Sequence, residues 1–352
     1  MPAHHFRSLR GDLSWIEVEG PSLGDATLKD PTTREVAVYA PPGLSSEGAT
    51  VPLLVALAPY TSSGLKLTAW QAFGESLPAR IDRLIEAGHM RPTVVAMPDT
   101  FTSLGGNQFI DSPVMGRWST WLAEDLLPAL ERSFPAGGSA QMRGLFGRSS
   151  GGYGALVNAM LRPDVWGAVA CHSGDVNFDL LYRPELPKAA VALARFGGDI
   201  EAFLDHLRAQ PKLGGKDFYA LMMLAMAATY DPRPSLPSGM TLPIDLHTCA
   251  LDEEAWDRWC RWDPLRLLDD PTHVAALKKL RFLFVDCGRH DEYHLQFGNR
   301  QLDARLHAEQ VPHLYEEFDG GHSGVDYRLD RSLPAMVDAM VDAMVDDDVE
   351  GG

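Results

Sequence analysis

Residues 143–156 read RGLFGRSSGGYGAL, and this stretch carries the most structural information in the chain. Its centre, Gly147-Arg148-Ser149-Ser150-Gly151, fits the pattern G-x-S-x-G, which places a serine on a sharp turn between a buried strand and a helix. The flanking residues fit this position, because an apolar segment precedes the motif and a Gly-rich helical pattern follows it. We therefore expect Ser149 to stand above the strand end as a nucleophile. The alternative is a Gly-rich turn with a buried serine.

A nucleophilic serine needs donors for the negative charge that develops on the substrate oxygen. The backbone amide of Ser150 is one expected donor, since it begins the helix after the turn. A second should follow the apolar strand predicted at 51–58. Pro59 has no amide hydrogen, so Tyr60 is the expected donor and Thr61 the less favoured one. The alternative is an ordinary loop between a strand and a helix.

A serine also needs a base, and the base needs an acid that orients it, in the chain order Ser, acid, His for this kind of turn. His322 lies in the Gly-rich segment FDGGHSG after a short predicted strand and is the expected base. Asp291, in the segment FLFVDCGRHDE, is the expected acid. Glu292 is the second candidate for the acid, and Asp286 is the third.

The sequence predicts no cofactor and no metal site. His290 and His294 are four residues apart, but no third ligand pattern accompanies them. A phosphate-binding loop is excluded at the glycines of the motif, because no Lys-Ser or Lys-Thr pair follows them.

Strand-like and helix-like segments alternate along most of the chain, which predicts an α/β fold with a mostly parallel central sheet flanked by helices. Between Asp175 and Pro264 this alternation gives way to Pro-punctuated helical segments. We therefore expect a core formed by residues 1–174 and 265–352 and a helical cap or insertion at 175–264. The predicted strands are 34–39, 51–58, 93–97, 141–146, 165–171, 281–285 and 314–318, and the predicted core helices are 67–87, 116–134, 151–161, 297–310 and one from about 332.

Composition excludes several classes of protein. The chain has 352 residues with 48 Asp and Glu against 31 Lys and Arg, a net charge of -17, so its surface should repel nucleic acids and anionic membranes. No apolar run is long enough for a transmembrane helix, and no secretory signal is visible, which favours a cytoplasmic location. The four cysteines are far apart and predict reduced, mostly buried thiols.

Five segments together resemble one known family. They are VVAMPDTF, GRSSGGYGAL, RPDVWGAVACHSG, DCGRHDEY and GGHSGVDYR. They are similar to the esterase D family of α/β-hydrolases, which includes enterobactin-type esterases, feruloyl esterases, S-formylglutathione hydrolases and mycolyltransferases. The resemblance implies a Ser-Asp-His hydrolase with Ser149, Asp291 and His322 as the triad and Tyr60 and Ser150 at the oxyanion site. This chain departs from the family at Ala58-Pro59, where members usually have His-Gly.

Four residues are candidates for contacts with a substrate. Asp99 and Asp175 each follow a predicted strand and should face the edge of the sheet where ligands bind. Trp256 and Trp259 belong to a tryptophan stripe in the predicted cap, which either packs on neighbouring helices or forms a wall of the pocket.

The sequence therefore predicts a serine carboxylesterase that acts on a small-molecule ester through an acyl-enzyme. Two alternatives stay open: an acyltransferase of the same fold, and a catalytically silent protein that binds ligands in the same pocket.

Overall fold

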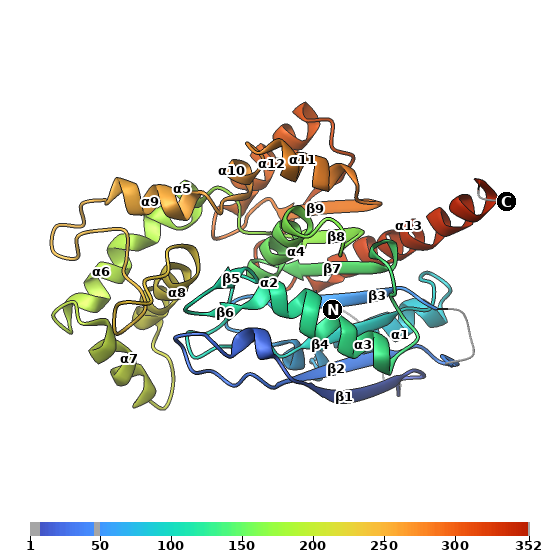
Figure 1. Cartoon of the computed structure of the whole chain (residues 1–352), viewed down its shortest axis with the longest axis horizontal. Coiled ribbons are helices and arrows are strands. Elements are labelled where there is room, and N and C mark those ends of the chain that lie inside the picture. Colours follow the sequence, from blue (N-terminus) through green and yellow to red (C-terminus); the bar gives the residue numbers. More distant parts are fainter. Residues whose placement is uncertain (1–7, 46–49, 351–352) are drawn as a thin grey trace.

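The computed structural model describes residues 8–45 and 50–350, the last eight of them by their backbone alone. At its centre is an eight-stranded sheet in the order β1-β2-β4-β3-β7-β8-β9-β10 (Figure 1). The strands of this sheet are β1 (Asp12–Val18), β2 (Arg34–Ala40), β3 (Leu53–Leu57), β4 (Val94–Pro98), β7 (Arg143–Arg148), β8 (Ala168–His172), β9 (Phe282–Gly288) and β10 (Leu314–Phe318). A separate hairpin pairs β5 (Asp111–Ser112) with β6 (Gly116–Arg117).

The sheet is parallel from β4 to β10, whereas β1 and β2 are antiparallel to their neighbours at one edge. All five residues of each of β3, β4 and β8 are buried. Parallel strands covered on both faces lack the alternation of polar and apolar residues, and these sequences lack it too. The predicted fold class is confirmed.

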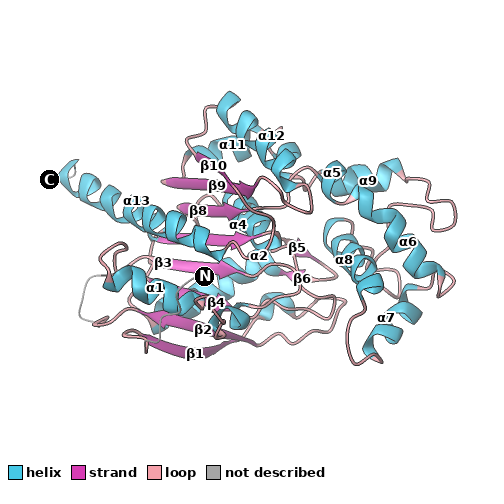
Figure 2. Cartoon of the chain, turned by 180° about the vertical axis from the view of Figure 1, so that it is seen from behind, coloured by secondary structure: helices cyan, strands magenta, loops and turns pink. Residues whose placement is uncertain are grey.

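Helices cover both faces of the sheet, and each face has its own apolar core. On one face α1 (Leu77–Glu86) and α13 (Leu329–Glu350) lie side by side across the strands (Figure 2). The opposite face packs against α2 (Trp118–Thr120), α3 (Leu127–Ser133), α4 (Ser150–Leu161) and α12 (Leu295–Ala308). A π-helical turn at 121–126 joins α2 to α3.

The chain between β8 and β9 is helical. Its elements are α5 (Phe178–Leu181), α6 (Leu186–Ala194), α7 (Ile200–Arg208), α8 (Gly215–Tyr230), α9 (Glu253–Cys260), α10 (Pro264–Leu267) and α11 (Pro271–Lys278). Of these, α6 to α9 lie beyond one end of the sheet rather than on its faces (Figures 1 and 2). Across the described ranges, no helix is long and apolar enough to cross a bilayer.

Two predicted helices begin at other residues in the structure, and one strand was not predicted. The helix predicted at 67–87 is wrong in its first half: a 3-10 turn ends at Thr68 and α1 begins only at Leu77, because Ser76 caps it and Pro78 fits the first turn but not a helix interior. Strand β1 was not predicted. The last helix starts three residues earlier than expected.

The four cysteines are free, and three of them are buried, namely Cys171, Cys260 and Cys287. Cys249 is partly exposed. Burial raises the pKa of the Cys171 thiol, which keeps it protonated and unreactive. This agrees with the prediction of reduced thiols that fill the core.

Candidate active site

Ser149 occupies the turn between β7 and α4 with φ 57° and ψ −127°. A residue other than glycine rarely adopts a positive φ, and such strain is found mainly where a side chain must be held for function. The turn places Ser149 on the wall of a cavity of about 430 Å³. Ser149 is therefore exposed to a ligand in that cavity, as the sequence motif predicts.

The glycines of the motif permit this turn because β3 passes directly behind it. A Cβ atom on Gly147 would lie 2.6 Å from the carbonyl oxygen of Leu57, which real Cβ contacts do not allow. A Cβ atom on Gly151 would come still closer to the same oxygen. Side chains at these two positions would push the turn away from the sheet.

His322 and Asp291 meet at the side of the cavity. Asp291 follows β9 and His322 follows β10, and the two strands are parallel neighbours. The Nδ1 atom of His322 is 2.7 Å from Oδ2 of Asp291, whose side chain is buried. The backbone N–H of Tyr293 donates to the other oxygen of Asp291 at 2.9 Å. With Nδ1 donating to Asp291, Nε2 of the imidazole keeps a free lone pair.

The backbone of His322 is held on both sides. Its N–H donates to Oε2 of Glu292 at 2.7 Å, and its carbonyl accepts from the guanidinium of Arg148 at 2.5 Å. The bond from the His322 N–H lowers the pKa of the Glu292 carboxyl. Glu292, the second candidate for the acid, thus accepts a hydrogen bond from the backbone of His322, whereas Asp291 contacts its ring. Sequence reasoning missed both supporting roles, although Arg148 lies inside the motif.

Asp286, the third candidate for the acid, contacts a different histidine, His172. Its Oδ1 atom is 2.7 Å from Nδ1 of His172, and its Oδ2 atom accepts from Arg328 at 2.8 Å. The other ring nitrogen of His172 is 2.9 Å from the hydroxyl of Ser332. These three residues form a hydrogen-bonded Asp-His-Ser array, but Asp286 and Ser332 are fully buried and closed to any substrate.

Two backbone amides near Ser149 are available as donors. Ser150 is the first residue of α4, so its N–H has no acceptor within the helix. The Tyr60 N–H has no acceptor among the residues that the structure describes. Thr61, the less favoured candidate, already donates its N–H to the carbonyl of Gly105 at 2.7 Å. Both Tyr60 and Ser150 line the cavity.

Asp175 also lines the cavity, directly beside the candidate nucleophile. Its Oδ1 atom is 3.5 Å from the hydroxyl oxygen of Ser149, and its Oδ2 atom accepts from Tyr182 at 2.8 Å and from Ser150 at 3.4 Å. Burial raises the pKa of the Asp175 carboxyl to about 6, with the Tyr182 hydrogen bond opposing the shift. The nearby His322 lowers this pKa and Asp291 raises it, both by smaller amounts.

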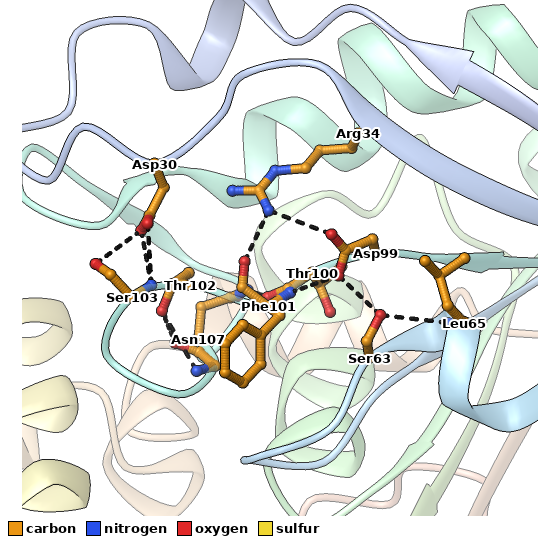
Figure 3. A network of polar contacts seen from close by, with 11 residues as sticks. Asp30, Arg34, Ser63, Leu65, Asp99, Thr100, Phe101, Thr102, Ser103 and Asn107 are labelled. Atoms are coloured by element: carbon orange, nitrogen blue, oxygen red, sulfur yellow. Dashed lines mark hydrogen bonds and ion pairs between the residues drawn. The ribbon is translucent and has the colours of Figure 1, made fainter. Parts of the chain in front are cut away.

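Asp99 lies in a different environment, although it too follows a strand. Its carboxylate accepts from the hydroxyl of Ser63 at 2.7 Å and lies 3.5 Å from the guanidinium of Arg34 on β2 (Figure 3). The Phe101 N–H donates to the same carboxylate at 3.1 Å. Asp99 is not in the cavity lining. Its contacts are those of a residue that orders the loop after β4.

Trp256 and Trp259 are buried in α9 and do not line the cavity. The indole N–H of Trp256 donates to Asp179 at 3.0 Å, and the ring of Trp259 packs against Tyr182 and Tyr230. Of the two interpretations of the stripe, these contacts favour packing between helices.

The cavity lining combines apolar and polar side chains. Residues of α5, α8 and α12 and the turns next to them are largely apolar or aromatic, namely Leu181, Tyr182, Phe218, Met222, Met226, Tyr293 and Leu295. Residues after β3 and β10 are mixed: Ser62, Lys66, Gln71, Ser323 and Asp326 are polar, whereas Leu67, Leu77, Val325 and Leu329 are apolar. A ligand beside Ser149 would therefore meet a mainly apolar surface from the helices and a mixed surface from the segments after the two strands.

One cluster outside the cavity brings potential metal ligands together. Asp303, His307 and His313 offer ligand atoms within 4.8 Å of one another. The His313 ring lies between the carbonyl of Val311 at 2.8 Å and the carboxylate of Asp303 at 3.0 Å, so an ordinary ion pair accounts for its position. The absence of a metal site thus stays a prediction.

Asp175→Asn should change the pH dependence of stability. The carboxyl has an ordinary pKa of 3.8 and a folded pKa of about 6, so the folded protein binds the proton more tightly than the unfolded chain. As the pH rises from about 4 to about 6, the wild type should lose about 3 kcal/mol of unfolding free energy relative to the variant. Urea unfolding of both proteins at pH 4 and pH 7 measures this difference, since all other groups are common to them. An equal difference at both pH values contradicts the prediction.

An eight-stranded, mostly parallel sheet with a strained serine turn at the end of β7 defines the class of α/β-hydrolases. The Esterase family model matches residues 30–339. The chain belongs to the Esterase family and is a carboxylic ester hydrolase by that membership. A search of the curated proteins found no match.

Solved structures share the fold at low sequence identity. A ferulic acid esterase is 18% identical with a TM-score of 0.60, over 94% of this chain and 98% of that chain. S-formylglutathione hydrolase FrmB from Staphylococcus aureus is 16% identical with a TM-score of 0.55, over 93% and 99%. A ferulic acid esterase from Anaeromyces mucronatus, solved in complex with ferulic acid, is 13% identical with a TM-score of 0.55, over 96% and 94%.

Proposed function

We propose that the protein hydrolyses carboxylic esters with Ser149 as nucleophile, His322 as general base and Asp291 as the acid that orients it. The observation that carries the proposal is the 2.7 Å contact between Asp291 and the Nδ1 atom of His322 on the wall of the cavity that Ser149 also lines. That contact leaves Nε2 as the only ring nitrogen able to take a proton from a serine.

The reaction proceeds in two halves. The Ser149 hydroxyl turns from Asp175 toward Nε2 of His322, loses its proton to that nitrogen and attacks the ester carbonyl. The backbone amides of Ser150 and Tyr60 stabilise the negative oxygen of the tetrahedral intermediate. His322 then protonates the leaving alcohol. Water attacks the acyl-enzyme by the same route and releases the acid.

We further propose that the chain belongs to the esterase D and enterobactin-esterase-like branch of its family. In this proposal residues 1–174 and 265–352 form the catalytic core, and residues 175–264 form a cap over the acyl site. Phe218, Met222 and Met226 of α8 support the assignment of the cap, because they line the cavity from outside the sheet. Methionine side chains adapt to different ligand shapes, which suits a wall for an apolar acyl chain.

The test uses p-nitrophenyl esters from acetate to laurate and a fluorophosphonate probe. We expect hydrolysis of the shorter members, with a fall at the chain length that exceeds a cavity of about 430 Å³, and covalent labelling of Ser149 located by peptide mass spectrometry. A folded protein that neither hydrolyses any ester nor reacts with the probe would instead be the silent binding protein. Labelling at another residue would overturn the assignment of the nucleophile.

A further inference from the structure

Asp175 is a buried carboxylate whose negative charge has few compensating partners. Asp175 is 4% exposed, and among the residues that the structure describes Tyr182 supplies its only hydrogen bond shorter than 3.4 Å. Within residues 8–45 and 50–350 it forms no ion pair with a lysine or an arginine. A buried negative charge is normally paired with a positive one. The Asp175 carboxylate lacks such a partner among the described residues.

Two other buried aspartates have their negative charge compensated by an arginine. Asp286 is 2.8 Å from the guanidinium of Arg328, and Asp231 is 2.8 Å from that of Arg258. Neither of these aspartates lines the cavity, whereas Asp175 does. Asp82 and Asp263 are also buried without a lysine or arginine partner, but two or more backbone N–H groups donate to each of them. Asp175 accepts from hydroxyl groups alone among the described residues, and it faces the cavity.

The position of Asp175 relative to Ser149 sets where that ligand group would lie. A substituent on the carbon next to the scissile carbonyl is three bonds from the serine oxygen, or about 3 Å at roughly 1.5 Å per bond and ordinary bond angles. The Oδ1 atom of Asp175 is 3.5 Å from the same serine oxygen. An N–H donor on that carbon can therefore reach hydrogen-bond distance of Oδ1 when it lies on the Asp175 side of the serine oxygen.

We propose that Asp175 binds an ammonium group on the carbon next to the ester carbonyl, so that the preferred substrates are esters of α-amino acids. This inference rests on the proposed ester hydrolysis at Ser149. The apolar wall formed by Leu181, Phe218 and Met222 would hold the side chain of the amino acid, which favours apolar residues such as leucine. The net charge of -17 would also attract a cationic substrate rather than an anionic one.

The test compares three ethyl esters that share one carbon skeleton: those of L-leucine, its 2-hydroxy analogue and 4-methylpentanoic acid, which differ in the substituent at carbon 2. Each kcat/KM at pH 7.5 is divided by the alkaline hydrolysis rate of the ester, which removes intrinsic reactivity. A charge-assisted hydrogen bond should favour the leucine ester over the 4-methylpentanoate ester by roughly 10- to 100-fold in the wild type. Asp175→Asn should reduce this ratio to about that of a neutral contact, within about threefold of unity.

Asp99→Asn is the matched control. Asp99 also follows a strand but lies outside the cavity lining, so the ratio between the two esters should stay as in the wild type. Circular dichroism checks that both variants are folded. A loss of the ratio in Asp99→Asn as well would overturn the assignment to Asp175.

The remaining outcomes separate this inference from the proposed function. Hydrolysis of all three esters at similar normalised rates overturns the ammonium site and leaves ester hydrolysis standing. Equal preference for the leucine and 2-hydroxy esters, both lost in Asp175→Asn, overturns the requirement for a cation. No hydrolysis of any ester overturns the proposed function and this inference with it.

Discussion

Ser149→Ala should lower kcat for a p-nitrophenyl ester by on the order of 10⁴-fold or more, because the variant lacks the hydroxyl that forms the acyl-enzyme in the proposed mechanism. Residual hydrolysis would come from the backbone donors and from binding alone. Fluorophosphonate labelling should disappear with the activity. The fold should survive, since alanine can occupy the same strained turn as serine at no greater steric penalty.

Ser332→Ala provides a closely matched control for this experiment. Ser332 is hydrogen-bonded to a histidine, His172, whose other nitrogen faces an aspartate, Asp286. It differs from Ser149 in burial, because its side chain is wholly inaccessible. This variant should keep the labelling and the turnover to within about tenfold. Retention of activity in Ser149→Ala together with loss in Ser332→Ala would reverse the assignment of the two arrays.

The fold and the turn at Ser149 were predictable because their signals are local. The G-x-S-x-G motif specifies a backbone conformation over five residues, and the apolar strands before and after it specify a covered parallel sheet. Strand β1 is different, since it lies at the edge of the sheet and has several exposed or half-exposed residues. Its weak hydrophobic pattern left nothing in the sequence to distinguish it from a polar loop.

The two candidate aspartates show why the rest of the site needed a structure. Asp99 and Asp175 each follow a buried strand, and sequence patterns do not separate them. What separates them is a contact over long sequence distance: Arg34 of β2 lies beside Asp99, whereas no described lysine or arginine pairs with Asp175. The pairing of β2 with β4 that creates this contact depends on the order of the strands in the sheet.

The contacts that hold His322 in place also join residues that are far apart in the sequence. Glu292 was recognised as a possible acid because it is adjacent to Asp291, but its hydrogen bond to the backbone of His322 joins residues 30 positions apart. Arg148 reaches the same histidine across 174 positions. A motif can identify residues that perform chemistry, whereas residues that hold them are identified by distances in the folded chain.

Asp291→Ala and Asp286→Ala should have opposite consequences, although both aspartates are buried and each binds a histidine at 2.7 Å. Asp291→Ala should lower kcat by on the order of 10⁴-fold, because His322 loses the partner that fixes its tautomer and stabilises its protonated form. Its effect on the unfolding free energy should be modest, about 1 to 3 kcal/mol, since a neutral imidazole at the cavity wall can turn to solvent.

Asp286→Ala should instead destabilise the fold by about 3 to 5 kcal/mol, because it leaves the guanidinium of Arg328 without its buried partner and His172 without its acceptor. The folded fraction should still turn over ester within about tenfold of the wild-type kcat, since Asp286 is not in the cavity lining. Urea unfolding at 25 °C and kcat measured under fully folding conditions separate the two quantities. If Asp286→Ala removed turnover in a protein shown to be folded, or Asp291→Ala left it intact, the acid of the proposed triad would have to be reassigned to Asp286. The comparison is informative because the two aspartates are five positions apart and equally inaccessible, and each binds a histidine. They differ in which histidine they bind and in Arg328, which pairs with Asp286 and not with Asp291.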